Sequence, residues 1–100
     1  MKNFIFISPN FPENYWRFCA ALRERGLRVL GVGDCPYDGL SEQLRCILDE
    51  YYYVSSLEHY DEVYGAVAYF AFKYGKPDWL ESNNEYWLER DARLREDFNI

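Results

Sequence analysis

The chain has 100 residues, a mass of 12.0 kDa and a formal net charge of −6, which is the size of one domain. An aromatic content of 20% excludes a disordered chain, and the acidic balance argues against nucleic acid as a partner. No apolar run approaches the length of about 18 residues that a membrane span needs. The chain also starts without the pattern of a signal peptide, so we expect no membrane contact and a cytoplasmic location.

The chain begins with an apolar run followed by a helical pattern. Residues 4–7 have no polar member, which is typical of a strand buried on both faces. Asn10 is predicted to be the N-cap of a first helix, with Pro12 in its first turn and Gly26 just past its end. A second strand is expected over residues 27–32.

The same alternation continues to the end of the chain. Gly75 is predicted to stop the third helix, and Ser82 with Glu85 to form a capping box for the fourth. The remaining elements are a helix capped by Ser41, a strand at 51–54, a helix at 60–74, a strand at 78–81 and a helix at 85–97.

Strands that alternate with helices pair in parallel, and the helices must then cover both faces of the sheet. The sequence therefore predicts an α/β fold, a three-layer Rossmann-like sandwich of four parallel strands with helices on both faces. The strand at residues 4–7 should lie inside the sheet, because it lacks a polar face.

Three cysteines occur without a CxxC pair, and the chain has a single histidine, His59. This pattern argues against a disulfide framework and against a metal site, and it favours free thiols. Cys19 lies on the apolar face of the first helix and should be buried, whereas Cys35 falls in a loop.

Ligands of parallel α/β sheets bind beyond the carboxyl ends of the strands. Two loops there carry the candidate binding residues. Helix capping is the competing explanation for most of them. For Glu81, two outcomes stay open: a carboxylate bonded to backbone N–H groups of the Asn10 turn, or an open carboxylate that receives an amine. The candidate substrate-binding residues are Ser8, Pro9, Asn10, Glu81, Asn83 and Asn84.

Other chemistries fit the sequence less well. Gly31, Gly33 and Asp34 form part of a dinucleotide fingerprint, but they follow the second strand, and Pro36 stands where the third glycine belongs. His59 has no partner nucleophile near it in the sequence, so no catalytic residue is predicted. The aromatic side chains are too many to be interior in 100 residues, and some should form an exposed packing surface.

The segment from residue 81 to residue 100, which reads ESNNEYWLERDARLREDFNI, resembles the end of the N-terminal domain of ATP-grasp ligases. The opening FISPNFP of residues 6–12 and the run at 26–34 fit the same family. The resemblance implies a single pre-ATP-grasp domain over residues 1–100, cut from a longer enzyme that uses ATP and Mg²⁺ to join a carboxylate to an amine or thiol.

Compared with the ATP-grasp family that it resembles, the chain lacks the residues that would bind ATP and Mg²⁺. It contains three lysines, none in a phosphate-binding context, so no cofactor is expected in the chain itself and the chain alone should be inactive. ATP and Mg²⁺ would be held by C-terminal ATP-grasp lobes, the expected partner. Ser8, Pro9, Asn10 and Glu81 match family positions that touch the non-nucleotide substrate, a small carboxylate or amine. The alternative is a free-standing Rossmann-like binding or interaction module, or a subunit encoded by a split gene.

Overall fold

The computed structural model describes residues 1–82 and 84–100, and of residue 85 only the backbone. Strands and helices alternate through the described chain, as the sequence predicts. In chain order the elements are β1 (Asn3–Ile7), α1 (Trp16–Glu24), β2 (Arg28–Gly33), a 3₁₀ turn (Tyr37–Gly39), α2 (Glu42–Ile47), β3 (Glu50–Tyr53), α3 (Tyr60–Tyr74), β4 (Trp79–Glu81), a 3₁₀ turn (Glu85–Trp87) and α4 (Leu88–Asp97).

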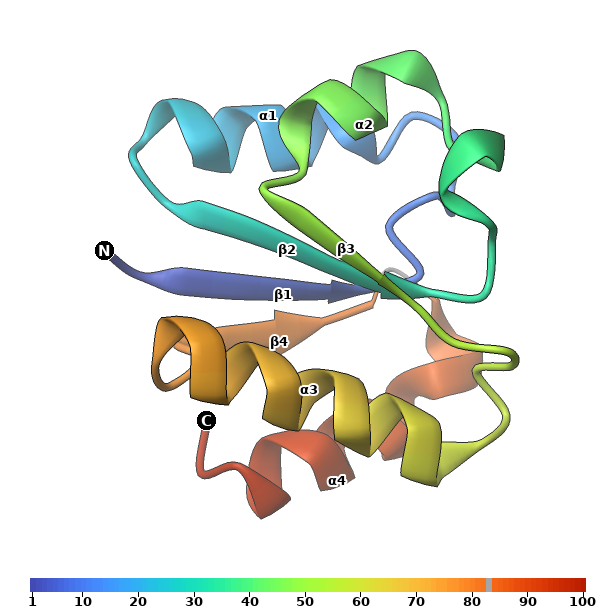
Figure 1. Cartoon of the computed structure of the whole chain (residues 1–100), viewed down its shortest axis with the longest axis vertical. Helices are drawn as coiled ribbons and strands as arrows, with labels where there is room; N and C mark the ends of the chain where they lie inside the picture. Colours follow the sequence, from blue (N-terminus) through green and yellow to red (C-terminus); the bar gives the residue numbers. More distant parts are fainter. Residues whose placement is uncertain (83) are drawn as a thin grey trace.

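The four strands form one parallel sheet in the order β3-β2-β1-β4 (Figure 1). β1 pairs with β2 on one side and with β4 on the other, where Phe6 lies opposite Glu81. The predicted α/β fold and the predicted interior position of the first strand are therefore confirmed.

The sheet is the middle layer of three. α1 and α2 cover one face, and α3 and α4 cover the other (Figure 1). Side chains of β1 alternate between the two cores, since Phe6 packs toward Cys19 and Leu44 whereas Ile5 packs toward Val67 and Phe70. Both faces of the first strand are thus buried, which explains why residues 4–7 include no polar side chain.

The first helix begins later than the sequence predicts. α1 starts at Trp16, and Asn10 does not cap it, because the Asn10 side chain instead accepts a long bond from the Ser8 hydroxyl at 3.5 Å. Pro12 cannot donate a backbone hydrogen bond, and it disfavours a helical conformation for the residue before it. Residues 8–15 therefore form separate turns rather than the first turn of a helix.

The fourth helix also starts differently from the predicted capping box. Ser82 is not the cap: its hydroxyl donates to the carboxylate of Asp91 in α4. The side-chain oxygen of Asn84 accepts from the backbone N–H of Tyr86 at 3.0 Å and so satisfies the start of the 3₁₀ turn. Two other predicted helix boundaries hold, because Ser41 accepts from the Leu44 N–H at 3.1 Å and Gly75 ends α3 with a φ of 96°. The third strand spans residues 50–53 rather than 51–54, and α4 begins at Leu88 rather than at residue 85.

The cysteines lie as predicted. Cys19 is buried between α1 and the sheet, Cys35 is half-buried in the loop after β2, and Cys46 is exposed, all three as free thiols. Within the described part of the chain, no helix combines the length and the apolar character that crossing a membrane requires.

Candidate functional site

The carboxyl ends of β1 and β4 mark the point where the winding of the sheet reverses. From β1 the chain builds the sheet in one direction through β2 and β3, and it then returns to place β4 on the other side of β1. Ligands of open parallel sheets bind at such a reversal, because the two loops that leave it diverge to opposite faces. The predicted residues Ser8 and Asn10 lie in the loop after β1, Glu81 is the last residue of β4, and Asn84 lies in the loop after it.

The loop after β1 is held tightly to the sheet. Ser8 has a φ of 58°, and its backbone N–H donates to the carbonyl of Val32 at 2.7 Å. Pro9 is buried, and its Cγ would lie 3.1 Å from a Cβ atom added to Gly31. Pro9 is therefore a packing residue, and Ser8 and Asn10 remain as the polar groups of this loop that can reach a ligand.

Asn10 is exposed beside a shallow hollow of about 310 Å³. The hollow lies between the loop after β1 and the start of α2. The residues that line it are Asn10, Glu13, Gly39, Ser41 and Leu44. Its walls offer amide, carboxylate and hydroxyl groups, so it suits a small polar molecule.

Glu81 is exposed at the last position of β4. Its Oε2 accepts a hydrogen bond of 2.8 Å from the indole Nε1 of Trp79, two residues earlier on the same face of the strand. The carboxylate is therefore bonded to an indole rather than to the Asn10 turn. Glu81 has no ion pair with another described residue. Asn83 lies outside the described residues.

A second carboxylate, that of Asp91 in α4, lies near the end of β4, and the sequence analysis did not predict it as a site residue. Asp91 of α4 is only 3% exposed, it accepts from the Ser82 hydroxyl, and its Oδ1 has no partner among the described residues. Burial raises the pKa of Asp91, and the nearby charge of Glu81 acts in the same direction. Burial raises the pKa of the Tyr15 phenol, and the charges of Cys19, Glu81 and Asp91 act in the same direction, in that order.

Replacing Asp91 with asparagine is expected to flatten the dependence of stability on pH. Because the folded-state pKa is raised, the unfolded chain releases this proton first, near the ordinary value of about 3.9. Asp91 therefore contributes a loss of stability as the pH rises from there through its folded-state pKa, and this contribution is absent from the variant. Urea unfolding from acidic to neutral pH measures the difference.

The matched control for this variant is Glu89→Gln, which removes an exposed carboxylate from the same helical turn. Its stability curve should run parallel to the wild-type curve. If the Asp91→Asn and wild-type curves are parallel as well, Asp91 is not held in a desolvated environment.

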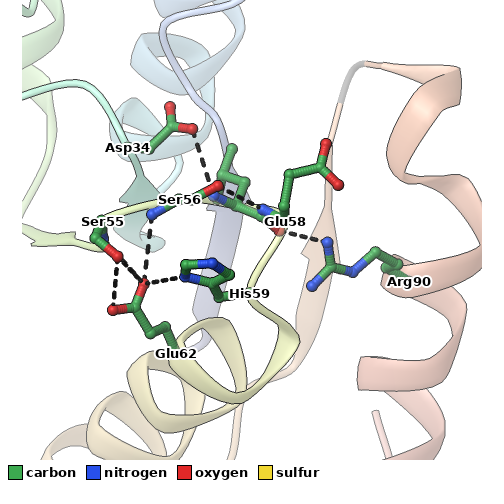
Figure 2. A network of polar contacts seen from close by, with 8 residues as sticks. Asp34, Ser55, Ser56, Glu58, His59, Glu62 and Arg90 are labelled. Atoms are coloured by element: carbon green, nitrogen blue, oxygen red, sulfur yellow. Dashed lines mark hydrogen bonds and ion pairs between the residues drawn. The ribbon is translucent and has the colours of Figure 1, made fainter.

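The carboxyl ends of β2 and β3 carry a separate network of polar contacts (Figure 2). Glu62, in the first turn of α3, accepts from the Ser55 hydroxyl at 2.7 Å and from the Ser55 N–H at 3.0 Å, and it lies 3.6 Å from His59. The hydrogen bond from Ser55 lowers the pKa of Glu62. Asp34 accepts from the Leu57 N–H at 3.4 Å. No capping pattern signals this role in the sequence, because the side chain of the N-cap residue His59 makes no capping hydrogen bond and Glu62 bonds to Ser55 instead.

Arg90 connects α4 to this network. Its Nη1 donates to the carbonyl of Leu57, and its guanidinium lies 5.5 Å from the ring of Tyr60 and 5.3 Å from the ring of Trp87. Most of the groups in Figure 2 thus make hydrogen bonds or ion pairs with one another, and these contacts hold the loop after β3 in place.

No lysine lies at the carboxyl edge of the sheet. All three lysines lie at the opposite edge: Lys2 precedes β1, Lys76 follows α3, and Lys73 donates to Glu50 at the start of β3 at 2.8 Å. Phosphoryl groups and the metal ions that accompany them need cationic groups and clustered acids. Within the described residues, no three histidine, cysteine or acidic side chains are grouped to hold a metal ion.

Comparisons of the chain with models of protein families, with curated proteins and with solved structures found no match.

Proposed function

We propose that the chain is the N-terminal, substrate-side domain of an ATP-grasp carboxylate–amine ligase. One observation carries the proposal: the exposed carboxylate of Glu81 lies at the end of β4, beside the reversal of the sheet, with no cation paired to it among the described residues. The resemblance of residues 81–100 to the end of the family's N-terminal domain agrees with this position.

The electrostatics of the site favour an amine over a carboxylate as the ligand of this domain. Glu81 and Asp91 are both acidic, and their charges act together on Tyr15. A second negative charge would be repelled there, whereas a protonated amine would be attracted. Ser8 and Asn10, from the loop after β1, would offer oxygen atoms that accept from the same ammonium group.

ATP and Mg²⁺ belong to other parts of such an enzyme in this proposal, because the carboxyl edge lacks the lysines and clustered acids that phosphates and metal need. The residues of this chain would bind the amine and orient it. Activation of the carboxylate would take place on the ATP-grasp lobes.

Titrations followed by amide NMR shifts test the proposal on the 100-residue chain. Mg-ATP should cause no saturable shifts, and a panel of small primary amines should shift the amides of Ser8, Asn10, Glu81 and Asn84. Glu81→Gln should remove the amine shifts. Glu58→Gln, which changes another exposed glutamate at the same edge, should retain them. Saturable Mg-ATP shifts in these loops would contradict the proposal and favour a free-standing nucleotide-binding module.

A further inference from the structure

One face of β4 is open. The strand lies at the edge of the sheet, and its central residue, Leu80, is buried in the core on the side of α3 and α4. Trp79 and Glu81 point to the opposite side, because side chains alternate along a strand. On that side α1 packs against β2, which is separated from β4 by β1. As a result, Trp79 is 53% exposed.

Aromatic rings from three elements meet on this open side. Phe4 of β1 lies opposite Trp79 in the parallel register, and the centroids of their rings are 6.2 Å apart. Phe18 of α1 packs edge-on against Phe4 at 6.3 Å and is itself 46% exposed. We call these three rings, together with Glu81, the β4 surface. Contiguous exposed apolar side chains of this kind mark binding surfaces.

The charge of the β4 surface favours a cation. The faces of aromatic rings attract cations, and a carboxylate does so more strongly. Elsewhere in the described chain, arginine and lysine side chains lie over exposed rings, for example Arg93 over Tyr60 at 4.1 Å. Among the described residues, none places a cation over the rings of the β4 surface or in an ion pair with Glu81.

A hollow of about 280 Å³ adjoins the β4 surface and fixes the direction of a bound ligand. The residues that line it are Lys2, Asn3, Phe4, Leu27, Asp78 and Trp79. Lys2 repels a cation from the hollow, and the carboxylate of Asp78 already accepts from the backbone N–H of Asn3 at 2.8 Å. Glu81 attracts a cation instead, beside the indole of Trp79 to which it is bonded. A ligand would therefore place its cation at Glu81 and its apolar part toward the hollow.

We infer that the amine received by this domain carries an apolar group about the size of a benzene ring, and that the β4 surface selects for it. The inference rests on the proposed function, because it names the class of amine that Glu81 binds. The ammonium group pairs with Glu81, and the apolar group lies over Trp79 and Phe18 toward the hollow. Burial of a ring against these side chains favours such an amine over a small one by about 10-fold or more.

Titrations followed by NMR shifts of the Trp79 indole N–H and of the β4 amides test this inference on the 100-residue chain. Phenethylamine should bind at least about 10-fold more tightly than ethylamine, which has the same ammonium group and no ring. Glu81→Gln should weaken the binding of both amines. The neutral analogue 2-phenylethanol keeps the ring without the charge, and it should bind more weakly than phenethylamine.

Variants of the aromatic side chains locate the preference. Phe18→Ala should reduce the preference for phenethylamine to less than about 3-fold and leave ethylamine binding unchanged. Trp79→Leu, at the edge of the sheet, should reduce the same preference without a change in α1, so the test does not depend on one variant folding. Phe72→Ala, which truncates a 93% exposed phenylalanine on α3, is the matched control and should keep the preference.

The possible outcomes separate this inference from the proposed function. Equal binding of the two amines at Glu81 would overturn the inference and leave the proposed function standing, whereas binding of neither amine would overturn both. Equal binding of phenethylamine and 2-phenylethanol would assign the β4 surface to an uncharged apolar partner. Shifts of the same amides that depend on protein concentration alone would assign it to a second copy of the chain. Either of these results would also overturn the inference.

Discussion

Replacing Phe70 with alanine is expected to lower the free energy of unfolding by about 3–5 kcal/mol, the usual loss for truncating a buried phenylalanine. Phe70 is 1% exposed at the centre of the core between α3 and the sheet. Its ring contacts three tyrosine rings at centroid distances of 5.5–6.2 Å, those of Tyr52, Tyr69 and Tyr74. Because such domains are stable by only about 5–15 kcal/mol, the variant should be partly unfolded near physiological temperature.

The matched control is Phe72→Ala, two residues further along the same helix. Phe72 is 93% exposed, so its truncation should change stability by less than about 0.5 kcal/mol. Urea unfolding followed by circular dichroism measures both variants. Equal losses for Phe70→Ala and Phe72→Ala would show that α3 does not pack against the sheet through the face described above.

The parallel sheet could be predicted from the sequence because each strand is a short apolar run, and the same alternation of strand and helix occurs four times along the chain. The run at residues 4–7 is apolar at every position, and the structure buries it between two neighbouring strands and two helical layers. The exposure of Phe72 was not predicted, because the sequence has more aromatic residues than a core can hold and does not show which of them stay at the surface.

The capping residues were harder to assign because one polar side chain has several available partners. Ser82 and Asn10 have the right residue types for N-caps, yet Ser82 bonds to Asp91, and Asn10 bonds to Ser8. Those partners come from the tertiary fold or from a turn shaped by two prolines, and neither is visible in a capping pattern.

The candidate site was predicted only in part. Asn10 and Glu81 could be placed at the carboxyl edge of the sheet, because Asn10 follows a predicted strand and Glu81 is the last residue of another. Asp91 was missed because, in the sequence, it is one charge among several on a polar helix, and only the packing of α4 against β4 buries it. The bond from the Trp79 indole to Glu81 follows from the alternation of side chains along β4, which a three-residue strand signals weakly.

Glu81→Gln is expected to lower kcat/KM for the amine substrate by about 30-fold or more in the longer enzyme that this domain would serve, since an ammonium group would lose its charged partner. The fold should be unaffected, because the glutamine side-chain oxygen can still accept from the Trp79 indole at the position of the carboxylate oxygen. The KM for ATP should also stay unchanged, because the nucleotide would bind to other lobes. Glu58→Gln is again the control at the same edge.

The proposed role of Glu81 as the amine-binding carboxylate of a ligase domain is tested most directly by measuring kcat/KM for the amine and the Tm together in wild-type and Glu81→Gln enzyme. The account predicts a large loss of kcat/KM at an unchanged Tm. Unchanged kinetics with a lowered Tm would contradict it and make Glu81 a structural residue that holds Trp79 at the edge of the sheet.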